Sequence, residues 1–204
     1  MTIAIVKYGM GNVASVQKVL KKLGYSSIIT DSHSEIKQSD LILLPGVGSF
    51  KQGMENLNNY GLVDLLTKEV LINKKPFIGI CLGMQLLATY GNEPEKVAGL
   101  GWIDGEVVKI ESPKGLRIPH LGWNTLNTSS SKELYISSSQ KDYYFIHSYH
   151  FKVDNPDVVT FTVNYDGEIA AALQKDNIYA MQFHPEKSQQ VGMDLLKKII
   201  DQYA

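Results

Sequence analysis

The first eighty residues alternate strand-like runs with amphipathic segments. Short, largely apolar runs at 3–6, 26–30, 41–44 and 77–80 predict strands, and the most apolar of them have the pattern of strands buried on both faces. Between the first two runs, apolar residues recur at helical spacing, with Asn12 as a helix cap before them and Gly24 after them. A second helix is predicted from about Gly61. This order is typical of a parallel sheet with right-handed crossovers.

From Trp102 onward the pattern changes to closely spaced strands. They are predicted at 106–111, 143–148, 158–163, 169–173 and 179–183, with a turn at 175–177 that joins the last two as a hairpin. A short polar loop is predicted at 128–132 and a terminal helix at 191–200. Because no repeat or linker interrupts the chain, we expect one domain over residues 1–204. Its class is α/β, an open twisted, mainly parallel sheet flanked by helices, with an added antiparallel β portion in the second half.

Composition and charge narrow the classes of function. The 204 residues are 44% hydrophobic and 20% charged, and the net charge of −1 comes with no basic stripe, which argues against nucleic acid and acidic membranes as partners. One cysteine cannot form an internal disulfide and is typical of a reducing compartment. The scattered histidines offer no metal-ligand spacing, so no metal or cofactor is expected. We therefore expect a cytoplasmic protein.

The single cysteine stands at the most informative position of the chain. The strand at 77–80 runs directly into Cys81, and the following run, 82–90, predicts a helix. Cys81 therefore lies at a sharp strand-to-helix turn with Gly79 and Gly83 on either side, which is the form of a nucleophile elbow with sulfur in place of oxygen. The first helical N–H groups would favour the thiolate. A buried structural cysteine is the alternative.

A cysteine nucleophile needs an imidazole base, and the base needs an orienting acceptor. Of the five histidines, His184 ends an apolar strand and precedes Pro185 and Glu186. A residue before proline is extended, so His184 and Glu186 project to the same side and the carboxylate can reach one ring nitrogen. The sequence thus predicts that Cys81, His184 and Glu186 act together as nucleophile, base and orienting carboxylate. The alternative is that His184 and Glu186 only cap the end of a strand, with the carboxylate in solvent. His33 is expected in a polar loop.

These motifs together resemble a known family. The segments 79–85 (G-I-C-L-G-M-Q) and 183–186 (F-H-P-E) are similar to the triad-type, class I glutamine amidotransferases, whose fold is flavodoxin-like. The resemblance narrows to the glutaminase subunits of imidazole glycerol phosphate synthase and spans nearly the whole chain. It rests on 8–12 (Y-G-M-G-N), 44–50 (L-P-G-V-G-S-F), 118–124 (I-P-H-L-G-W-N), 145–149 (F-I-H-S-Y) and 183–189 (F-H-P-E-K-S-Q).

The resemblance implies an activity and a partner. It implies hydrolysis of L-glutamine to glutamate and ammonia, without a cofactor, in a heterodimer. The ammonia would pass to a (β/α)8-barrel cyclase subunit that makes imidazole glycerol phosphate and an aminoimidazole carboxamide ribotide in histidine biosynthesis.

Other functions stay open. Lys7 stands where the family usually has an acidic residue, and paralogues with the same motifs supply ammonia for the amidination of bacterial surface sugars. A cysteine peptidase would use the same nucleophile and base. A flavodoxin-like binding module with an inert cysteine is the non-catalytic alternative.

The tetrahedral intermediates of amide hydrolysis carry a negative oxygen that needs hydrogen-bond donors. Leu82 follows the nucleophile directly, so its N–H is one predicted donor. The second is expected from the glycine-rich loop after the third strand, from the N–H of Val47 or Gly48.

The resemblance also implies residues that bind the substrate and the partner. Gln85 lies one helical turn beyond Cys81 and would face the amino-acid end of glutamine. Backbone contacts to the same end are expected from His147, Ser148 and Tyr149. The expected partner interface consists of Pro119, His120, Trp123 and Asn124, although Trp123 could instead be a core residue.

Overall fold

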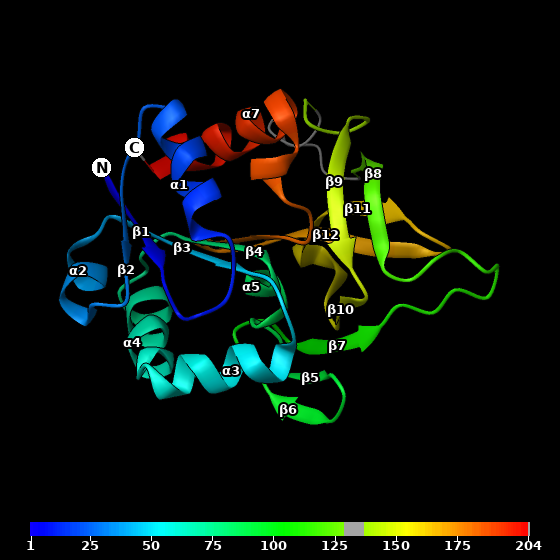
Figure 1. Ribbon diagram of the computed structural model, residues 1–204, viewed down its shortest axis with the longest axis horizontal. Helices are drawn as coiled ribbons and strands as arrows, with labels where there is room; N and C mark the ends of the chain where they lie inside the picture. Colours follow the sequence, from blue (N-terminus) through cyan, green and yellow to red (C-terminus); the bar gives the residue numbers. More distant parts are fainter. Residues whose placement is uncertain (129–136, 204) are drawn as a thin grey trace.

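The computed structural model describes residues 1–128 and 137–203, and a nine-stranded sheet runs through them (Figure 1). Its strands, in spatial order, are β2 (Ser26–Thr30), β1 (Thr2–Val6), β3 (Leu41–Gly46), β4 (Phe77–Cys81), β13 (Ile178–Met181), β12 (Glu168–Lys175), β11 (Val159–Asn164), β8 (His120–Asn127) and β9 (Asp142–His147). Neighbours from β2 to β13 run parallel, and neighbours from β13 to β9 run antiparallel. The parallel half with its antiparallel extension confirms the predicted fold class.

A second, four-stranded sheet lies beside the first. Its order is β10 (Tyr149–Val153), β7 (Gly105–Lys109), β5 (Tyr90–Asn92) and β6 (Lys96–Ala98). β10 follows β9 almost directly, so the chain passes from the large sheet into the small one at Ser148. The predicted hairpin between β12 and β13 is confirmed, with Lys175 opposite Ile178 and Asp176 in a left-handed conformation at the turn.

Helices cover both faces of the large sheet. Figure 1 shows α1 (Val13–Lys22) and α7 (Gln189–Ile200) on one face, and α3 (Phe50–Asn59) and α4 (Leu62–Thr67) on the other. The other helical elements among the described residues are α2 (His33–Gln38), α5 (Leu82–Gln85), the π-helical η1 (Lys68–Ile72), and the 3-10 turns η2 (Pro156–Val158), η3 (Pro185–Lys187) and η4 (Asp201–Tyr203). None of the helices in the described ranges is both long and apolar enough to cross a membrane.

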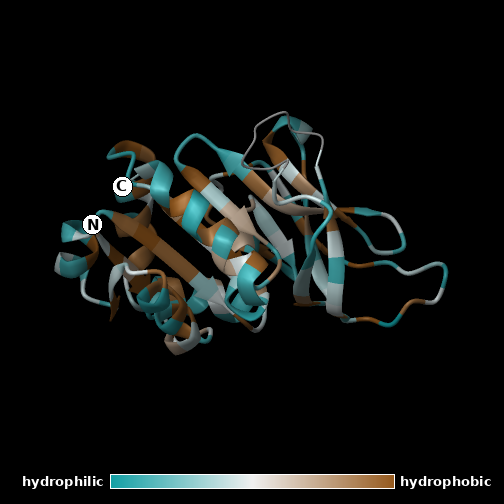
Figure 2. Ribbon diagram, turned by 90° about the horizontal axis from the view of Figure 1, so that it is seen from above, coloured by the Kyte–Doolittle hydropathy of each residue, from teal (hydrophilic) through white to brown (hydrophobic). Residues whose placement is uncertain are grey.

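Alternation along the buried strands produces two hydrophobic cores. In β1, Ile3 and Ile5 pack with the apolar faces of α1 and α7, whereas Ala4 and Val6 pack with those of α3 and α4. Such strands appear as continuous apolar runs because both faces are covered. Figure 2 shows largely hydrophobic strands beside helices in which hydrophilic and hydrophobic residues alternate.

Several elements differ from the sequence prediction. The helix expected over 82–90 ends at Gln85, because the next carbonyls, Leu86 to Ala88, accept from N–H groups of the segment 100–103. His33 was expected in a loop but begins the short helix α2. Only Ile36 of that helix is buried, so its sequence shows no helical period of apolar residues. Helix α3 was not predicted, although its buried residues Phe50, Met54 and Leu57 recur at helical spacing. Positions 129–132 of the predicted polar loop lie outside the described residues.

The turn from β4 into α5 is packed closely enough to exclude side chains. A Cβ added to Gly83 would lie 1.9 Å from the Leu44 carbonyl oxygen, and one added to Gly79 would lie 2.7 Å from the Gly83 carbonyl oxygen. Both obstacles are backbone atoms, so they cannot rotate away. The glycines therefore allow α5 to lie against β3 and β4, which fixes the direction in which Cys81 projects.

We predict that Gly83→Ala lowers the free energy of unfolding by about 3 kcal/mol or more, because β3 and α5 must separate. The matched control is Gly115→Ala, at φ +80°, where an added Cβ would have no atom of the described residues within 4 Å apart from those of its chain neighbours. This control carries only the cost of a left-handed backbone, about 1–2 kcal/mol. Urea unfolding followed by tryptophan fluorescence measures both values, and equal losses would contradict the close packing at the turn.

Candidate active site

The carboxyl ends of three neighbouring parallel strands meet at the candidate site. In the register of the sheet, Gly46 of β3 pairs with Cys81 of β4, and Ile80 of β4 pairs with Met181 of β13. The residues that follow β13 therefore lie beside Cys81, although about a hundred positions separate them in sequence. Ligands of open α/β sheets bind at this edge.

Cys81 adopts a backbone conformation that is rare for residues with a side chain. Its φ of 55° and ψ of −109° mark a sharp turn between β4 and α5, and such conformations cost about 1–3 kcal/mol. The side chain is 6% exposed. The Gln182 side-chain amide donates to the sulfur at 3.6 Å, and the Ile146 carbonyl oxygen lies 3.9 Å from it. The structure thus has the geometry of a nucleophile elbow.

His184 and Glu186 form a buried pair. The His184 Nδ1 and a Glu186 carboxylate oxygen are 2.7 Å apart, and the two side chains are 3% and 2% exposed. Pro185 begins the turn η3 between them and fixes the chain direction. The carboxylate thereby orients the ring and supplies the charge that a protonated imidazole needs in a buried site.

The second ring nitrogen of His184 is the one that remains for Cys81. Burial lowers the pKa of His184, but hydrogen bonding and charge interaction with Cys81 and Glu186 outweigh it and raise that pKa to about 9. Nε2 nevertheless meets no partner at standard hydrogen-bond geometry in the described part of the chain. The contact with sulfur is therefore longer or less well aligned than a standard hydrogen bond, as is common in unliganded sites.

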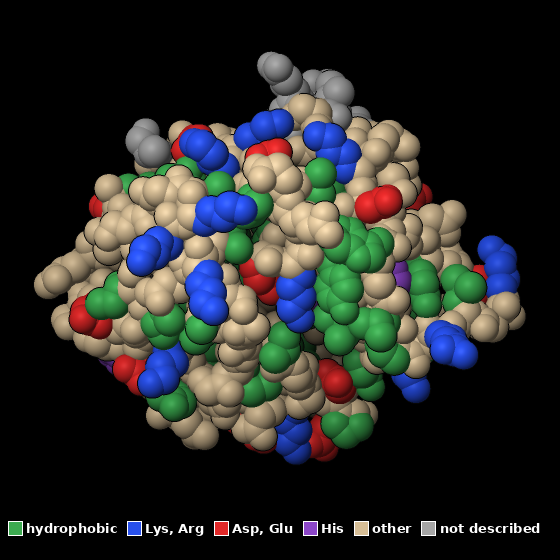
Figure 3. All heavy atoms as spheres, turned by 45° about the horizontal axis from the view of Figure 1, so that its top comes forward, with side chains coloured by type: hydrophobic (Ala, Val, Ile, Leu, Met, Phe, Trp, Pro, Cys, Tyr) green, Lys and Arg blue, Asp and Glu red, His purple; other side chains and the backbone are tan. Residues whose placement is uncertain are grey.

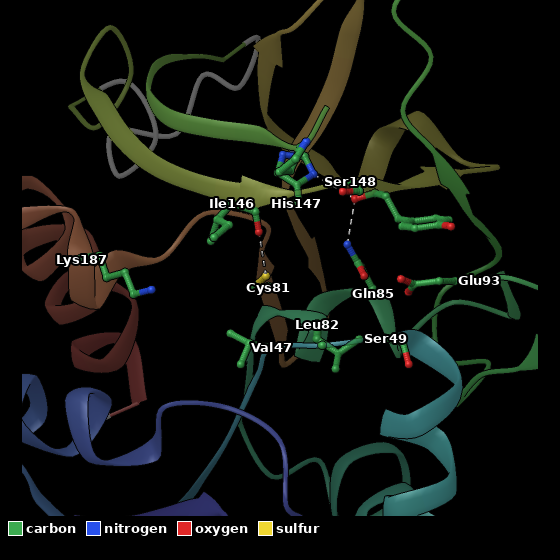
Figure 4. Close-up of a pocket in the computed structure, with 13 residues that line it drawn as sticks. Val47, Ser49, Cys81, Leu82, Gln85, Glu93, Ile146, His147, Ser148 and Lys187 are labelled. Atoms are coloured by element: carbon green, nitrogen blue, oxygen red, sulfur yellow. Dashed lines mark hydrogen bonds between the residues drawn. The ribbon is translucent and has the colours of Figure 1, made fainter. Parts of the chain in front are cut away.

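A pocket of about 590 Å³ opens at the sulfur (Figure 4). Cys81 and Leu82 lie at its base, His147 and Ser148 form the opposite wall, and Lys187 lies at one side. The other lining residues are Val47, Gly48, Ser49, Gln85, Glu93, Pro119, Ile146 and Tyr149. His184 does not line the pocket, so it approaches the sulfur from the protein side. A volume of this size suits a small molecule such as an amino acid.

The residues predicted for the oxyanion hole line the same pocket. Leu82 is buried and begins α5, whereas Val47 is 41% exposed and Gly48 has a φ of +118°. Val47 and Gly48 belong to the loop between β3 and α3, and Figure 4 shows Val47 and Leu82 close together below the sulfur. The loop therefore lies where its backbone N–H groups can contribute to the pocket.

Gln85 is held by two hydrogen bonds. Its amide nitrogen donates to the Tyr149 carbonyl oxygen and to the Gln182 side-chain oxygen, both at 2.9 Å. It is 5% exposed and lines the pocket. Since both N–H bonds are committed, the group that Gln85 can offer a ligand is its side-chain oxygen.

His120 and His147 form a buried hydrogen-bonded pair, with Nδ1 of His120 3.0 Å from Nε2 of His147. His147 Nδ1 donates to the Tyr149 carbonyl oxygen at 2.9 Å, so its Nε2 must accept from His120. The Asn124 amide nitrogen completes the row at 3.3 Å from His120 Nε2. The His120 ring also stacks on Phe145. These contacts fix the strands that form one wall of the pocket.

The four residues predicted for the partner interface differ in their exposure to solvent. Trp123 is 47% exposed, and Pro119 lines the pocket. His120 is only 2% exposed, so its side chain lies inside the protein and not on its surface. Asn124 is half-buried and also donates to the Asn164 carbonyl oxygen.

Sequence reasoning missed several residues of the site. Glu93 lines the pocket and accepts a hydrogen bond from the Phe50 N–H at 2.9 Å, but in N-E-P-E nothing distinguishes it from Glu95. Gln182 stands two positions before His184, and its contact with Cys81 becomes predictable only once β4 and β13 are known to be neighbours. In the described ranges, no group of three or more potential ligand side chains could hold a metal ion.

The buried histidine pair makes stability depend on pH. Burial lowers the pKa of His120 to about 4 and that of His147 to about 3, from an ordinary value of 6.5. As the pH falls from 6.5 to about 4, the unfolded chain binds protons that the folded chain does not, so the free energy of unfolding decreases. We predict that His147→Gln, which removes one such proton, makes this decrease less steep in urea unfolding. Parallel profiles for the two proteins would mean that His147 is protonated in the folded state.

Comparison with known proteins assigns the family. The model of the family described as "Glutamine amidotransferase class-I" matches residues 4–202. The chain is 45% identical to "Imidazole glycerol phosphate synthase subunit HisH 1" of Campylobacter jejuni (strain RM1221), over 97% of this chain and 98% of that protein. It is 40% identical to "Imidazole glycerol phosphate synthase subunit HisH 2" of Pseudomonas aeruginosa (strain PAO1), over 98% of both chains.

A solved structure shares the fold. The structure of PurLQS from Thermotoga maritima matches with a TM-score of 0.74 and 16% identity, over 100% of this chain and 99% of that one. The identities to the two HisH subunits extend over essentially the full length of each protein. The chain therefore belongs to the class I glutamine amidotransferases and, within them, to the HisH subunits of imidazole glycerol phosphate synthase.

Proposed function

We propose that this chain hydrolyses L-glutamine to glutamate and ammonia with Cys81 as nucleophile, His184 as base and Glu186 as the group that orients the base. The observation that carries the proposal is the buried His184–Glu186 pair, which lies against a strained cysteine at the base of a pocket. Residues 1–204 act as one amidotransferase domain, in keeping with the family match over 4–202.

The reaction begins with a proton transfer from the Cys81 thiol to His184 Nε2. The raised pKa of His184 favours the imidazolium beside a thiolate at neutral pH. The thiolate attacks the side-chain carbonyl carbon of glutamine, and His184 gives its proton to the departing ammonia. Water activated by His184 then hydrolyses the thioester and releases glutamate. Glu186 holds Nδ1–H throughout, so the tautomer that presents Nε2 to sulfur is retained.

The developing oxyanion is stabilised by backbone N–H groups. The Leu82 N–H is the first donor, and the Val47 or Gly48 N–H is the second. Each donor contributes roughly 3–4 kcal/mol to the transition state. The exposure of Val47 and the left-handed φ of Gly48 suit a loop that adjusts when the substrate or a partner binds.

The amino-acid end of glutamine is bound on the far side of the pocket. Glu93 offers a carboxylate that would pair with the α-ammonium group, and the Gln85 side-chain oxygen can accept from the same group. The backbone of His147, Ser148 and Tyr149 forms the wall beside them. A charged α-ammonium group distinguishes a free amino acid from a peptide, which favours a glutaminase over a cysteine peptidase.

The mouth of the pocket lies beside an exposed apolar face. We define this apolar face as Leu121, Trp123, Val47 and Ile146, which are 58%, 47%, 41% and 38% exposed. Figure 3 shows hydrophobic side chains gathered on one side of the molecule, with Lys or Arg side chains next to them. Since Val47 and Ile146 also line the pocket, a partner bound here would cover the outlet for ammonia. We propose that this partner is the (β/α)8-barrel cyclase subunit of imidazole glycerol phosphate synthase, which would use the ammonia for histidine biosynthesis.

A paralogous role is the second candidate. The names of the two relatives carry copy numbers, HisH 1 and HisH 2. Lys7 is exposed and directly follows β1, at a position where the family usually has an acidic residue. The second candidate acceptor is a bacterial surface sugar that is amidinated. Ammonia transfer in complexes reconstituted with each type of barrel subunit distinguishes the two acceptors.

We predict that Cys81→Ala lowers glutamine-dependent synthesis in the complex by roughly 10⁴-fold or more, because the nucleophile is lost. Synthesis from added ammonia should persist, since the acceptor reaction takes place in the partner. Both rates are measured on the same complex, so the ammonia-dependent rate is the control for assembly. A glutaminase rate that survives the substitution would exclude Cys81 as nucleophile.

Glu93→Gln tests the proposed ammonium contact. The amide keeps an oxygen for the Phe50 N–H but loses the charge, so we expect the KM for glutamine to rise roughly tenfold with a small change in kcat. Glu95→Gln is the matched control, because Glu95 pairs with Lys51 outside the pocket. Steady-state glutaminase kinetics measure both variants. An unchanged KM in Glu93→Gln, or the same rise in both, would remove Glu93 from the substrate site.

A further inference from the structure

Gln182 is a buried glutamine whose side chain ends against the reacting sulfur. It is 0% exposed and follows directly on β13, where Met181 pairs with Ile80 of β4. This register brings Gln182 beside Cys81, and its amide nitrogen lies 3.6 Å from the sulfur. The distance suits an N–H···S hydrogen bond, which is longer than N–H···O because sulfur is the larger atom.

The direction of this hydrogen bond is set by a backbone carbonyl. The Tyr149 carbonyl oxygen can only accept, so the Gln85 group that lies 2.9 Å from it must be the amide nitrogen. That same nitrogen lies 2.9 Å from the Gln182 side chain, so Gln182 must present its oxygen to Gln85. The Gln182 amide nitrogen is then the atom that remains for the sulfur. Reversing the Gln182 amide would place two N–H donors against each other.

The Tyr149 carbonyl is itself held in place. It belongs to β10, which pairs with Lys109 of β7, and it also accepts from His147 Nδ1 at 2.9 Å. No side-chain rotation can therefore reverse the order of donors. The chain of hydrogen bonds runs from the fixed Tyr149 carbonyl through Gln85 and Gln182 to Cys81, so the group that faces the sulfur is an N–H.

We propose that Gln182 is a further catalytic residue, whose side-chain N–H donates to Cys81 and stabilises the thiolate. The inference rests on the proposed role of Cys81 as nucleophile. A hydrogen bond to an ionised sulfur is stronger than one to a thiol, so this contact favours the reactive form. It also offsets the Ile146 carbonyl oxygen, whose partial negative charge lies 3.9 Å from the same sulfur. When the thioester is hydrolysed, the departing thiolate regains the same donor.

Alkylation of Cys81 tests the proposal directly, because the chain has one cysteine and only the thiolate reacts. The pH dependence of the iodoacetamide reaction is measured for the full chain and for Gln182→Met, which keeps the length of the side chain and removes the amide. We expect the midpoint of the profile to rise by about one pH unit or more, which is a tenfold loss of thiolate at a fixed pH below it. Gln174→Met is the matched control, because it makes the same change on β12 opposite Tyr179. Equal midpoints in Gln182→Met and Gln174→Met would overturn the proposal.

A second measurement needs no variant at the site and covers the case in which Gln182→Met does not fold. In the wild-type chain labelled with ¹⁵N-glutamine, the Gln182 side-chain NH₂ resonance should shift with the same midpoint as the alkylation profile. The shift should disappear after Cys81 is alkylated. A resonance that does not respond to the ionisation of Cys81 would overturn the proposal.

The two readouts separate this inference from the proposed function. Unaltered alkylation and NMR profiles would exclude the proposed role of Gln182, even if glutamine hydrolysis still depended on Cys81. Glutaminase activity that persists in Cys81→Ala would exclude Cys81 as the nucleophile, even if Gln182 affected the thiol titration.

Discussion

The close approach of α5 to β3 and β4 is the constraint on which the rest of the structure depends. At Gly83 only a hydrogen atom fits against the Leu44 carbonyl oxygen, and Gly79 faces the backbone of Gly83 in the same way. At this turn Cys81 adopts a positive φ of 55°, which is rare for residues with a side chain. The strain costs free energy, but it lifts one side chain out of the strand and into a pocket at the edge of the sheet. An unstrained cysteine in β4 would point into one of the two cores.

The sheet brings together groups that the sequence keeps far apart. Its parallel half aligns Gly46, Cys81 and Met181, and its antiparallel half carries Ile146 and His147 over them. A buried pair such as His184 and Glu186 pays a desolvation penalty that seldom benefits stability. The proposed chemistry accounts for the pair better, since hydrogen bonding and charge interaction with Cys81 and Glu186 outweigh burial and raise the pKa of His184 to about 9. The neutral His120–His147 pair has the opposite role, because it can hold the pocket wall only while uncharged.

Much of this organisation could be predicted from the amino-acid sequence. Continuous apolar runs identified the strands of the parallel half, and Gly79, Cys81 and Gly83 together identified the sharp turn. The proximity of His184 to Glu186 followed from extended backbone before Pro185. The local pattern of apolar residues did not predict where α5 ends. The carbonyls of residues 86–88 accept hydrogen bonds from the segment 100–103, which lies more than ten positions away in sequence. The burial of His120 and the contact of Gln182 with Cys81 also depend on strand order, which no local period encodes.

The central claim is that Cys81 is the nucleophile that attacks the glutamine side chain. The most direct test is to treat the chain, assembled with the proposed barrel subunit, with a diazo-ketone analogue of glutamine and to locate the covalent label by peptide mass spectrometry. The account predicts that the label is found on Cys81, that glutamine protects against it, and that His184→Ala slows it strongly. A label on any other residue, or a labelling rate that glutamine does not reduce, would contradict it.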